Sequence, residues 1–71
     1  MNKPIYDLQH QIQDALSEIN KLRDAQIDVL DTNGIITLTG IVPTVQARER
    51  AEEIVRGMDG VVSVINELDV V

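Results

Sequence analysis

The sequence predicts an α+β fold with the element order α-β-β-α-β, in which two helices pack on one face of a three-stranded mixed sheet. Three observations favour this fold. Asn33-Gly34 stands between two runs rich in β-branched residues, which is the strongest short signal for a β-hairpin. In two other segments, apolar residues recur every three or four positions, the spacing of a helix face. A third alternating run closes the chain and predicts the last strand.

Length, charge and composition limit the classes of function. The 71 residues are expected to form one domain over 1–71, with a flexible start at 1–4, because so small a core cannot be divided. Twelve acidic residues against six basic give a net charge of −6, which repels nucleic acid and anionic lipid at long range. A single aromatic residue offers no stacking surface for bases. No nucleic-acid partner is therefore expected.

Cysteine content and hydropathy bear on the compartment. The chain has no cysteine, so disulfides and thiolate metal sites are excluded and the redox compartment stays open. No apolar run is long enough to cross a bilayer, and the first residues lead into an amphipathic segment rather than a secretory signal. The chain as written resembles a cytoplasmic protein in this respect, but a segment cut from an exported protein would have the same features, so the compartment stays open.

The first helix is expected from Ile5 to about Leu22. Its apolar residues share one helical face: Ile5, Leu8, Ile12, Ala15, Leu16, Ile19 and Leu22. Pro4 suits the opening turn, because its fixed φ is helical and its missing N–H is not needed there. His10 lies off the apolar face and is interpreted as a solvated helix residue, with a metal pair formed with Asp14 as the alternative.

The first strand is expected from Gln26 to about Leu30, and a type I′ turn at Asn33-Gly34 leads into the second, which ends before Pro43. The turn sets the register and places Ile27 opposite Gly40. Gly40 is expected to leave a gap where a helix could approach the sheet closely. This register buries the face that carries Ile27, Val29, Ile36, Leu38 and Val42.

The second helix is expected to begin at Pro43-Thr44, where the Thr44 hydroxyl can accept from free amides of the first turn. Its narrow apolar stripe consists of Ala47, Ala51, Ile54, Val55 and Met58, and its alanines suit a helix lying close to a sheet. Gly57 and Gly60 supply the helix end and the following turn. The mixed charges on the other side are interpreted as a solvated face.

The last strand is expected from Val61 or Val62 to about Val70. Its core face carries Val62, Val64, Asn66, Leu68 and Val70. The amide of Asn66 then needs hydrogen-bond partners, for which a neighbouring backbone group is the ordinary solution. The pattern leaves open whether this strand lies beside the first or the second.

The sheet face opposite the helices is the candidate interaction surface. Several of its residues are more apolar than a freely solvated sheet face requires, and contiguous apolar patches often mark contact sites. The alternative is that scattered β-branched residues simply favour strand geometry. A protein partner or self-association would use the residues Leu30, Ile35, Thr37, Thr39, Ile41 and Ile65.

No catalytic, cofactor or metal site is predicted. One histidine and no cysteine provide no pairing of nucleophile and base, so the chain is not expected to be an enzyme. An ion site formed by Asp28, Asp31 and Asn33 near the turn is the alternative. Val29 and Leu30 interrupt the alternating ligand series of a calcium loop, and the turn alone explains Asp31 and Asn33.

The order and spacing of several segments together resemble the BON domain, the module named for bacterial osmotically inducible and nodulation proteins. The matching segments cover nearly the whole chain: Ile12 to Ile19 with Asp14-Ala15-Leu16, Ile27-x-Val29, Asn33 to Val42, Ala47 with Ala51, and Gly60 to Val70. The resemblance implies the α-β-β-α-β fold and a non-enzymatic module of bacterial envelope and periplasmic proteins, without cofactor or catalytic motif. It also implies contacts with proteins or with phospholipid membranes, so lipid headgroups are an alternative to a protein partner.

Overall fold

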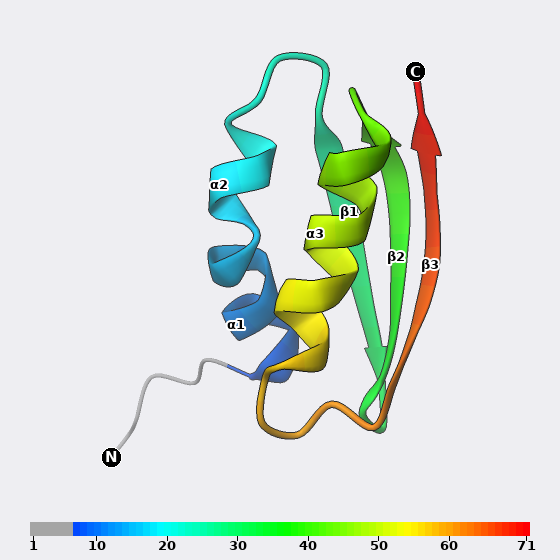
Figure 1. Ribbon diagram of the computed structural model, residues 1–71. Helices are drawn as coiled ribbons and strands as arrows, with labels where there is room; N and C mark the ends of the chain where they lie inside the picture. Colours follow the sequence, from blue (N-terminus) through cyan, green and yellow to red (C-terminus); the bar gives the residue numbers. More distant parts are fainter. Residues whose placement is uncertain (1–6) are drawn as a thin grey trace.

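A computed structural model describes residues 7–71 (Figure 1). Its elements in chain order are α1 (Leu8–Ala15), α2 (Ser17–Asn20), β1 (Gln26–Thr32), β2 (Ile35–Val42), α3 (Val45–Arg56) and β3 (Ser63–Val70). The predicted α+β fold is confirmed, with the first helix divided in two. The flexible start expected at 1–4 and Ile5 itself lie outside the described residues. The helix expected from Ile5 begins later, at Leu8, because Asp7 has an extended backbone and caps it.

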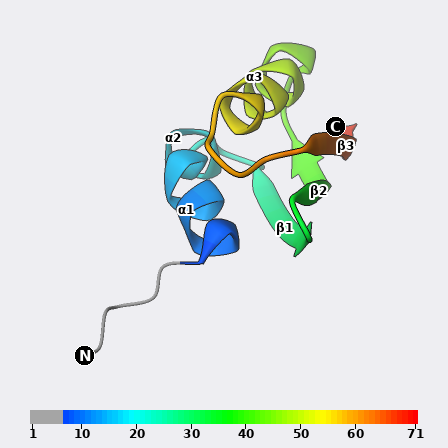
Figure 2. The same ribbon diagram turned by 90° about the horizontal axis from the view of Figure 1, so that it is seen from below.

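The sheet is mixed and its strand order is β1-β2-β3. β1 pairs with β2 antiparallel, and β3 pairs with β2 parallel, so the last strand lies beside the second. The helices lie on one side of the sheet, with α1 beside β1 and α3 against β3 and β2 (Figure 2). The α3 segment therefore returns the chain from the end of β2 to the start of the parallel β3, as a crossover helix does.

The hairpin forms where the sequence predicts it. Asn33 and Gly34 both have positive φ, 54° and 89°, as a type I′ turn requires. The Asp31 carboxylate accepts a hydrogen bond from the Gly34 N–H at 2.9 Å. The expected register is confirmed, because Ile27 faces Gly40 and every other pair of β1 and β2 follows the same register. β1 extends beyond the expected end and continues to Thr32.

The explanation predicted for Gly40 is wrong. A Cβ on this residue would lie 2.0 Å from the Gln26 carbonyl oxygen, which belongs to the neighbouring strand and not to a helix. Gly40 also has a φ of 121°, a conformation that L side chains rarely adopt. Glycine is needed here because of backbone geometry within the sheet.

The single first helix predicted from Ile5 to Leu22 is divided at Leu16. This residue departs from helical geometry (φ −88°, ψ 3°), and the Ile19 N–H donates to the Leu16 carbonyl, which tightens the turn. Leu16 and Ile19 are 0% and 3% exposed, so the tightened turn keeps both side chains in the core. Leu22 follows the end of α2 and is 45% exposed.

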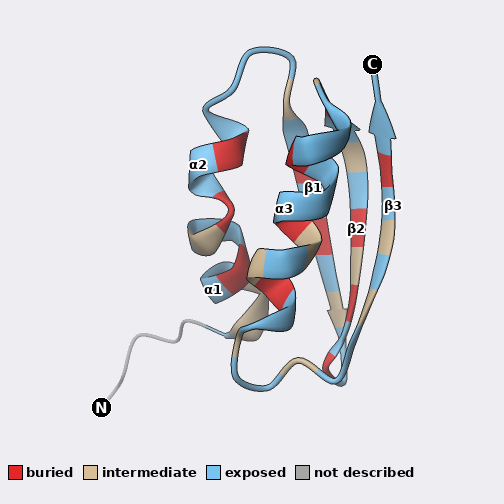
Figure 3. Ribbon diagram, in the orientation of Figure 1, coloured by how far each residue is buried: buried red, intermediate tan, exposed pale blue. Residues whose placement is uncertain are grey.

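The core lies between the helices and the sheet. Buried bands on the helices face the strands, and burial alternates along β1 (Figure 3). The fully or nearly buried residues are Ile12, Leu16, Ile19, Ile27, Val29, Ile36, Leu38, Val42, Ala47, Ala51, Val55 and Leu68. Every residue that the hairpin register assigns to the buried face is among them.

β3 contributes less to the core than predicted. Leu68 is buried and Val64 packs against the core, but Val62 precedes the strand and is 75% exposed, and Val70 is 37% exposed. Asn66 has the expected backbone partner. Its Nδ2 donates to the Arg48 carbonyl of α3 at 3.0 Å, so this side chain ties β3 to the helix above it.

Candidate interaction surface

No described element covers the face of the sheet opposite the helices (Figure 2). Because side chains alternate between faces, this open face carries the even-numbered residues of β1 and the odd-numbered residues of β2 and β3. Pairing lines them up in cross-strand rows: Thr32-Ile35-Ser63, Leu30-Thr37-Ile65, Asp28-Thr39-Glu67 and Gln26-Ile41-Asp69. These rows contain three carboxylates and neither lysine nor arginine.

Four of the predicted surface residues come together toward the hairpin end of the open face. Leu30, Thr37 and Ile65 form one row, and Ile35 lies in the adjacent row on the turn side. Leu30, Ile35 and Ile65 are 58%, 40% and 44% exposed, and Thr37 is half-buried between them. We call these four residues the apolar patch.

The other two predicted residues lie apart from the apolar patch. Thr39 is exposed between Asp28 and Glu67, and Ile41, 37% exposed, lies between Gln26 and Asp69. The open face is therefore divided along the strands, with the apolar patch toward the hairpin and carboxylates toward the other end. We call Asp28, Glu67 and Asp69 the acidic end.

Val62 is an exposed apolar residue that the alternating pattern misassigned to the core. Its N–H donates to the Gly34 carbonyl at 2.8 Å, which places it beside the hairpin turn. At 75% it is the most exposed large hydrophobic residue of the described chain. The signal that could have identified it is Gly60, because the turn there delays the start of the strand.

A groove of about 670 Å³ lies on the opposite side of the molecule, between α2 and α3. An ion pair crosses it, because the Arg50 guanidinium lies 3.3 Å from Glu18 of α2 and 3.1 Å from Glu53 of its own helix. Hydrogen bonds to Glu53 and Glu18 raise the pKa of Arg50 above its ordinary value. The groove is lined by Glu18, Ile19, Leu22, Thr44, Gln46, Ala47, Glu49, Arg50 and Glu53.

The alternative ion-site residues do not converge. Asp28 lies on the open face, whereas Asp31 is on the side of the helices and uses one carboxylate oxygen to accept from Gly34. Among residues 7–71, no three His, Cys, Asp or Glu side chains are grouped so that they could hold a metal ion. His10 is exposed, and its ring lies 2.9 Å from Asp7, the residue that caps α1.

The comparisons with known proteins agree with this architecture. A family model described as BON domain matches residues 7–71, which contain every helix and strand of the fold. No curated protein matches the chain. BON domains are binding or interaction modules, are generally not enzymes, and are associated with periplasmic and envelope proteins. From residue 7 onward, no helix is long and apolar enough to span a membrane. Because the match includes all three helices and all three strands of residues 7–71, the chain belongs to the BON domain family.

Proposed function

We propose that this domain is a protein-interaction module that binds its partner through the open face of the sheet. The observation that carries the proposal is the apolar patch, in which Leu30, Ile35 and Ile65 expose about half of their surface side by side. Binding of a partner is stabilised by about 25 cal/mol for each Å² of leucine and isoleucine surface that it removes from water. The sheet is covered on its other face only, which leaves room for a third layer.

The charges on the open face favour a basic partner. Asp28, Glu67 and Asp69 lie beside the apolar patch, and the face has no basic residue to neutralise them. A partner surface with apolar side chains next to lysine or arginine complements this arrangement. Two copies packed face to face would bring their carboxylates together, and each copy has a net charge of −6. We therefore favour a different protein over self-association.

Lipid headgroups are a less suitable ligand for this surface. The basic residues of α3 are Arg48, Arg50 and Arg56, and Arg50 and Arg56 form ion pairs with glutamates. A helix that binds anionic lipid instead presents unpaired lysine and arginine beside large apolar residues. Because BON domains are associated with periplasmic and envelope proteins, we propose a partner among the proteins of the envelope.

The test uses a helical peptide with leucine on one face and flanking lysines, titrated into the isotope-labelled domain. Amide shifts are expected to move at Leu30, Thr37 and Ile65. Leu30→Lys is expected to weaken binding about tenfold, since it places a charge in the centre of the contact. Leu22→Lys is the matched control, because Leu22 has similar exposure, 45% against 58%, and lies on the side of the helices.

Four results would overturn the proposal. The two leucine variants could weaken binding equally, or the shifts could fall in the groove between α2 and α3. The domain could form a dimer in light scattering that Leu30→Lys dissociates, which would make a second copy the occupant. Finally, flotation of the domain with phosphatidylglycerol vesicles, lost in Leu30→Lys, would assign the open face to lipid.

A further inference from the structure

We propose that the outer edge of β3 binds an extended peptide segment, with alternating basic and apolar side chains, as a fourth strand of the sheet. This edge is a different surface from the apolar patch, so the inference goes beyond the proposed function. It depends on main-chain hydrogen bonding, whereas the open face offers only side chains.

Alternate residues of β3 direct their main-chain groups away from the sheet. The N–H groups of Ser63 and Val71 donate to Gly34 and Val42, so the odd-numbered residues bond toward β2. The even-numbered residues therefore point outward, since the two directions alternate along a strand. In Figures 1 and 2, no described element lies beyond β3 on this side. The outward residues are Val64, Asn66, Leu68 and Val70.

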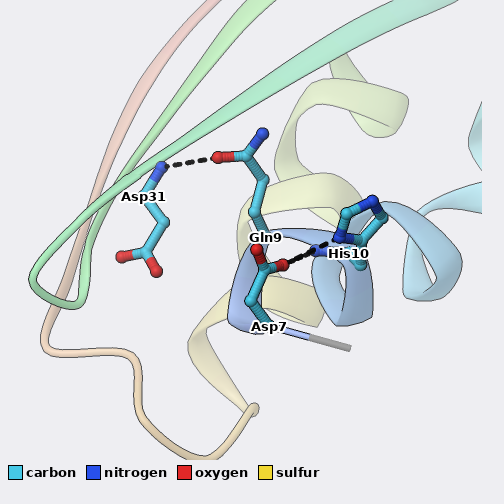
Figure 4. Close-up of polar contacts among 4 residues, drawn as sticks. All are labelled: Asp7, Gln9, His10 and Asp31. Atoms are coloured by element: carbon cyan, nitrogen blue, oxygen red, sulfur yellow. Dashed lines mark hydrogen bonds and ion pairs between the residues drawn. The ribbon is translucent and has the colours of Figure 1, made fainter. Parts of the chain in front are cut away.

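The opposite edge of the sheet is protected. Figure 4 shows the Gln9 side chain of α1 reaching the Asp31 N–H of β1, at 3.4 Å. Asn20 of α2 accepts in the same way from the Ile27 N–H, at 3.1 Å. Side chains of the N-terminal helices thus occupy two outward donors of β1, which is one of the ways in which proteins block strand addition.

The β3 edge has no such cover from another element. Among the outward main-chain N–H groups of β3 in the described residues, only that of Leu68 has a hydrogen-bond partner. It donates to Asn66 Oδ1 of the same strand at 3.2 Å. Asn66 itself is directed back toward α3 by its bond to the Arg48 carbonyl. Leu68 is buried, so the outward main-chain groups of Val64, Asn66 and Val70 form the template for an incoming strand.

The side chains beside this edge determine which strand fits. On the open face β3 presents Ile65, Glu67 and Asp69 in order, all exposed. Residues directly opposite one another on paired strands interact, and opposite charges there are favourable. An antiparallel strand would therefore carry a basic residue opposite Asp69, another opposite Glu67, and an apolar residue opposite Ile65. Its sequence pattern is basic-x-basic-x-apolar.

The same charges disfavour a second copy of this chain on the edge. A symmetric antiparallel pairing centred on Glu67 would set this carboxylate against itself and place Ile65 opposite Asp69. Like charges directly opposite destabilise a strand pair, and both chains carry a net charge of −6. The carboxylates thus act against self-pairing and favour a basic strand.

The experiment uses the peptide acetyl-Thr-Lys-Thr-Lys-Thr-Val-Thr-amide and the same peptide N-methylated at the amides that would face β3. The unmodified peptide is expected to slow hydrogen exchange at Val64, Asn66 and Val70. The methylated peptide keeps every side chain but cannot donate to the edge, so it is expected not to bind. Equal binding of the two peptides would overturn the proposal.

Protein variants separate the edge from the open face. Val70→Pro removes an outward N–H, which an edge strand tolerates, and it is expected to abolish binding of the peptide. Glu67→Lys is expected to weaken binding about tenfold and to restore it for a peptide with glutamate opposite position 67. Asp28→Lys is the matched control, because Asp28 lies in the same row at the other edge.

The outcomes distinguish this inference from the proposed function. Binding that is lost in Leu30→Lys but kept in Val70→Pro would mean that the peptide lies on the open face, which overturns the edge proposal only. Without peptide, the protection of the β3 amides from hydrogen exchange could rise with protein concentration. This result would assign the edge to a second copy of the chain and would also overturn the edge proposal.

Discussion

Replacing glycine by alanine is expected to have opposite effects on stability at Gly40 and Gly57. At Gly40 the φ of 121° is unfavourable for alanine, and the new Cβ would lie 2.0 Å from the Gln26 carbonyl oxygen. At Gly57 the backbone is helical (φ −81°, ψ −1°), and the nearest atom to a Cβ is 3.7 Å away. The same change of one methyl group therefore tests the backbone geometry of the sheet directly.

The magnitudes follow from these two environments. The disfavoured φ costs about 1–3 kcal/mol, and relieving the contact with Gln26 costs about 1–3 kcal/mol more. Gly40→Ala is thus expected to lower the free energy of unfolding by about 2–6 kcal/mol, a large part of the roughly 4–11 kcal/mol available to a chain of this length. Gly57→Ala is expected to raise it by about 0.4–1 kcal/mol, because it restricts the unfolded chain without strain.

Urea unfolding followed by far-ultraviolet circular dichroism measures both changes. Hydrogen exchange should locate the effect of Gly40→Ala at the end of the hairpin, where Gln26 pairs with Ile41. A Gly40→Ala variant within about 0.5 kcal/mol of the wild type would show that the strands separate there without cost. The assigned reason for this glycine would then be wrong.

Three further predictions concern the helix ends and the link between β3 and α3. Thr44→Ala is expected to lower the free energy of unfolding in urea by about 1 kcal/mol, because Thr44 Oγ1 accepts a hydrogen bond from the Ala47 N–H at 3.0 Å. Thr44→Ser should keep most of this stability. The pKa of the Asp7 carboxyl is lowered by the hydrogen bond from the His10 N–H and, to a smaller extent, by the one to the His10 ring. The ionised cap therefore stabilises α1 above the ordinary aspartate pKa, and this stabilisation is lost as pH falls below about 4. The amide shift of His10 should follow the loss, and in Asp7→Asn this shift should no longer depend on pH. Asn66→Asp removes the hydrogen bonds that Asn66 donates to the Arg48 carbonyl and to Glu52, and it is expected to lower the free energy of unfolding by about 1–3 kcal/mol. Glu52→Gln in the same chain should recover part of this stability. An unchanged thermal unfolding curve for Asn66→Asp would refute the proposed link between β3 and α3.

Local signals made most of the fold predictable from the sequence. The turn at Asn33-Gly34 fixes its own φ angles and, through them, the register of β1 on β2. The cap at Thr44 likewise depends on residues three positions apart. Both interactions close within a few residues of chain, so the residue types alone specify them. The buried faces of β1 and β2 follow from that register by alternation.

Features that depend on distant contacts could not be predicted in this way. The position of β3 beside β2 depends on how α3 packs, and the clash that requires Gly40 arises from Gln26, which another strand supplies. The tightened turn at Leu16 reflects the fit of this side chain into the core. In a helix pattern read from the sequence, Leu16 is one more residue of a continuous apolar face.

The candidate surface was likewise predictable only in part from the sequence. Alternation places each of its residues on the open face, but only the β2 and β3 register joins Ile65 to Leu30 across Thr37. The same register brings Glu67 into the row of Asp28. The alignment of the apolar residues in one part of the open face and of the carboxylates in another is therefore a property of the assembled sheet.

This separation has a consequence for how a partner would bind. Asp28 and Glu67 flank the middle strand and, with strands about 4.8 Å apart, they lie about 10 Å from one another, near the screening length at physiological salt. Their mutual repulsion then costs the free domain little, while a basic partner gains from both carboxylates at once. Charges of this kind mainly accelerate encounter and exclude acidic competitors, whereas buried apolar contacts set the lifetime of the complex. Added salt should thus slow association more than it speeds dissociation, and Leu30→Lys should do the reverse.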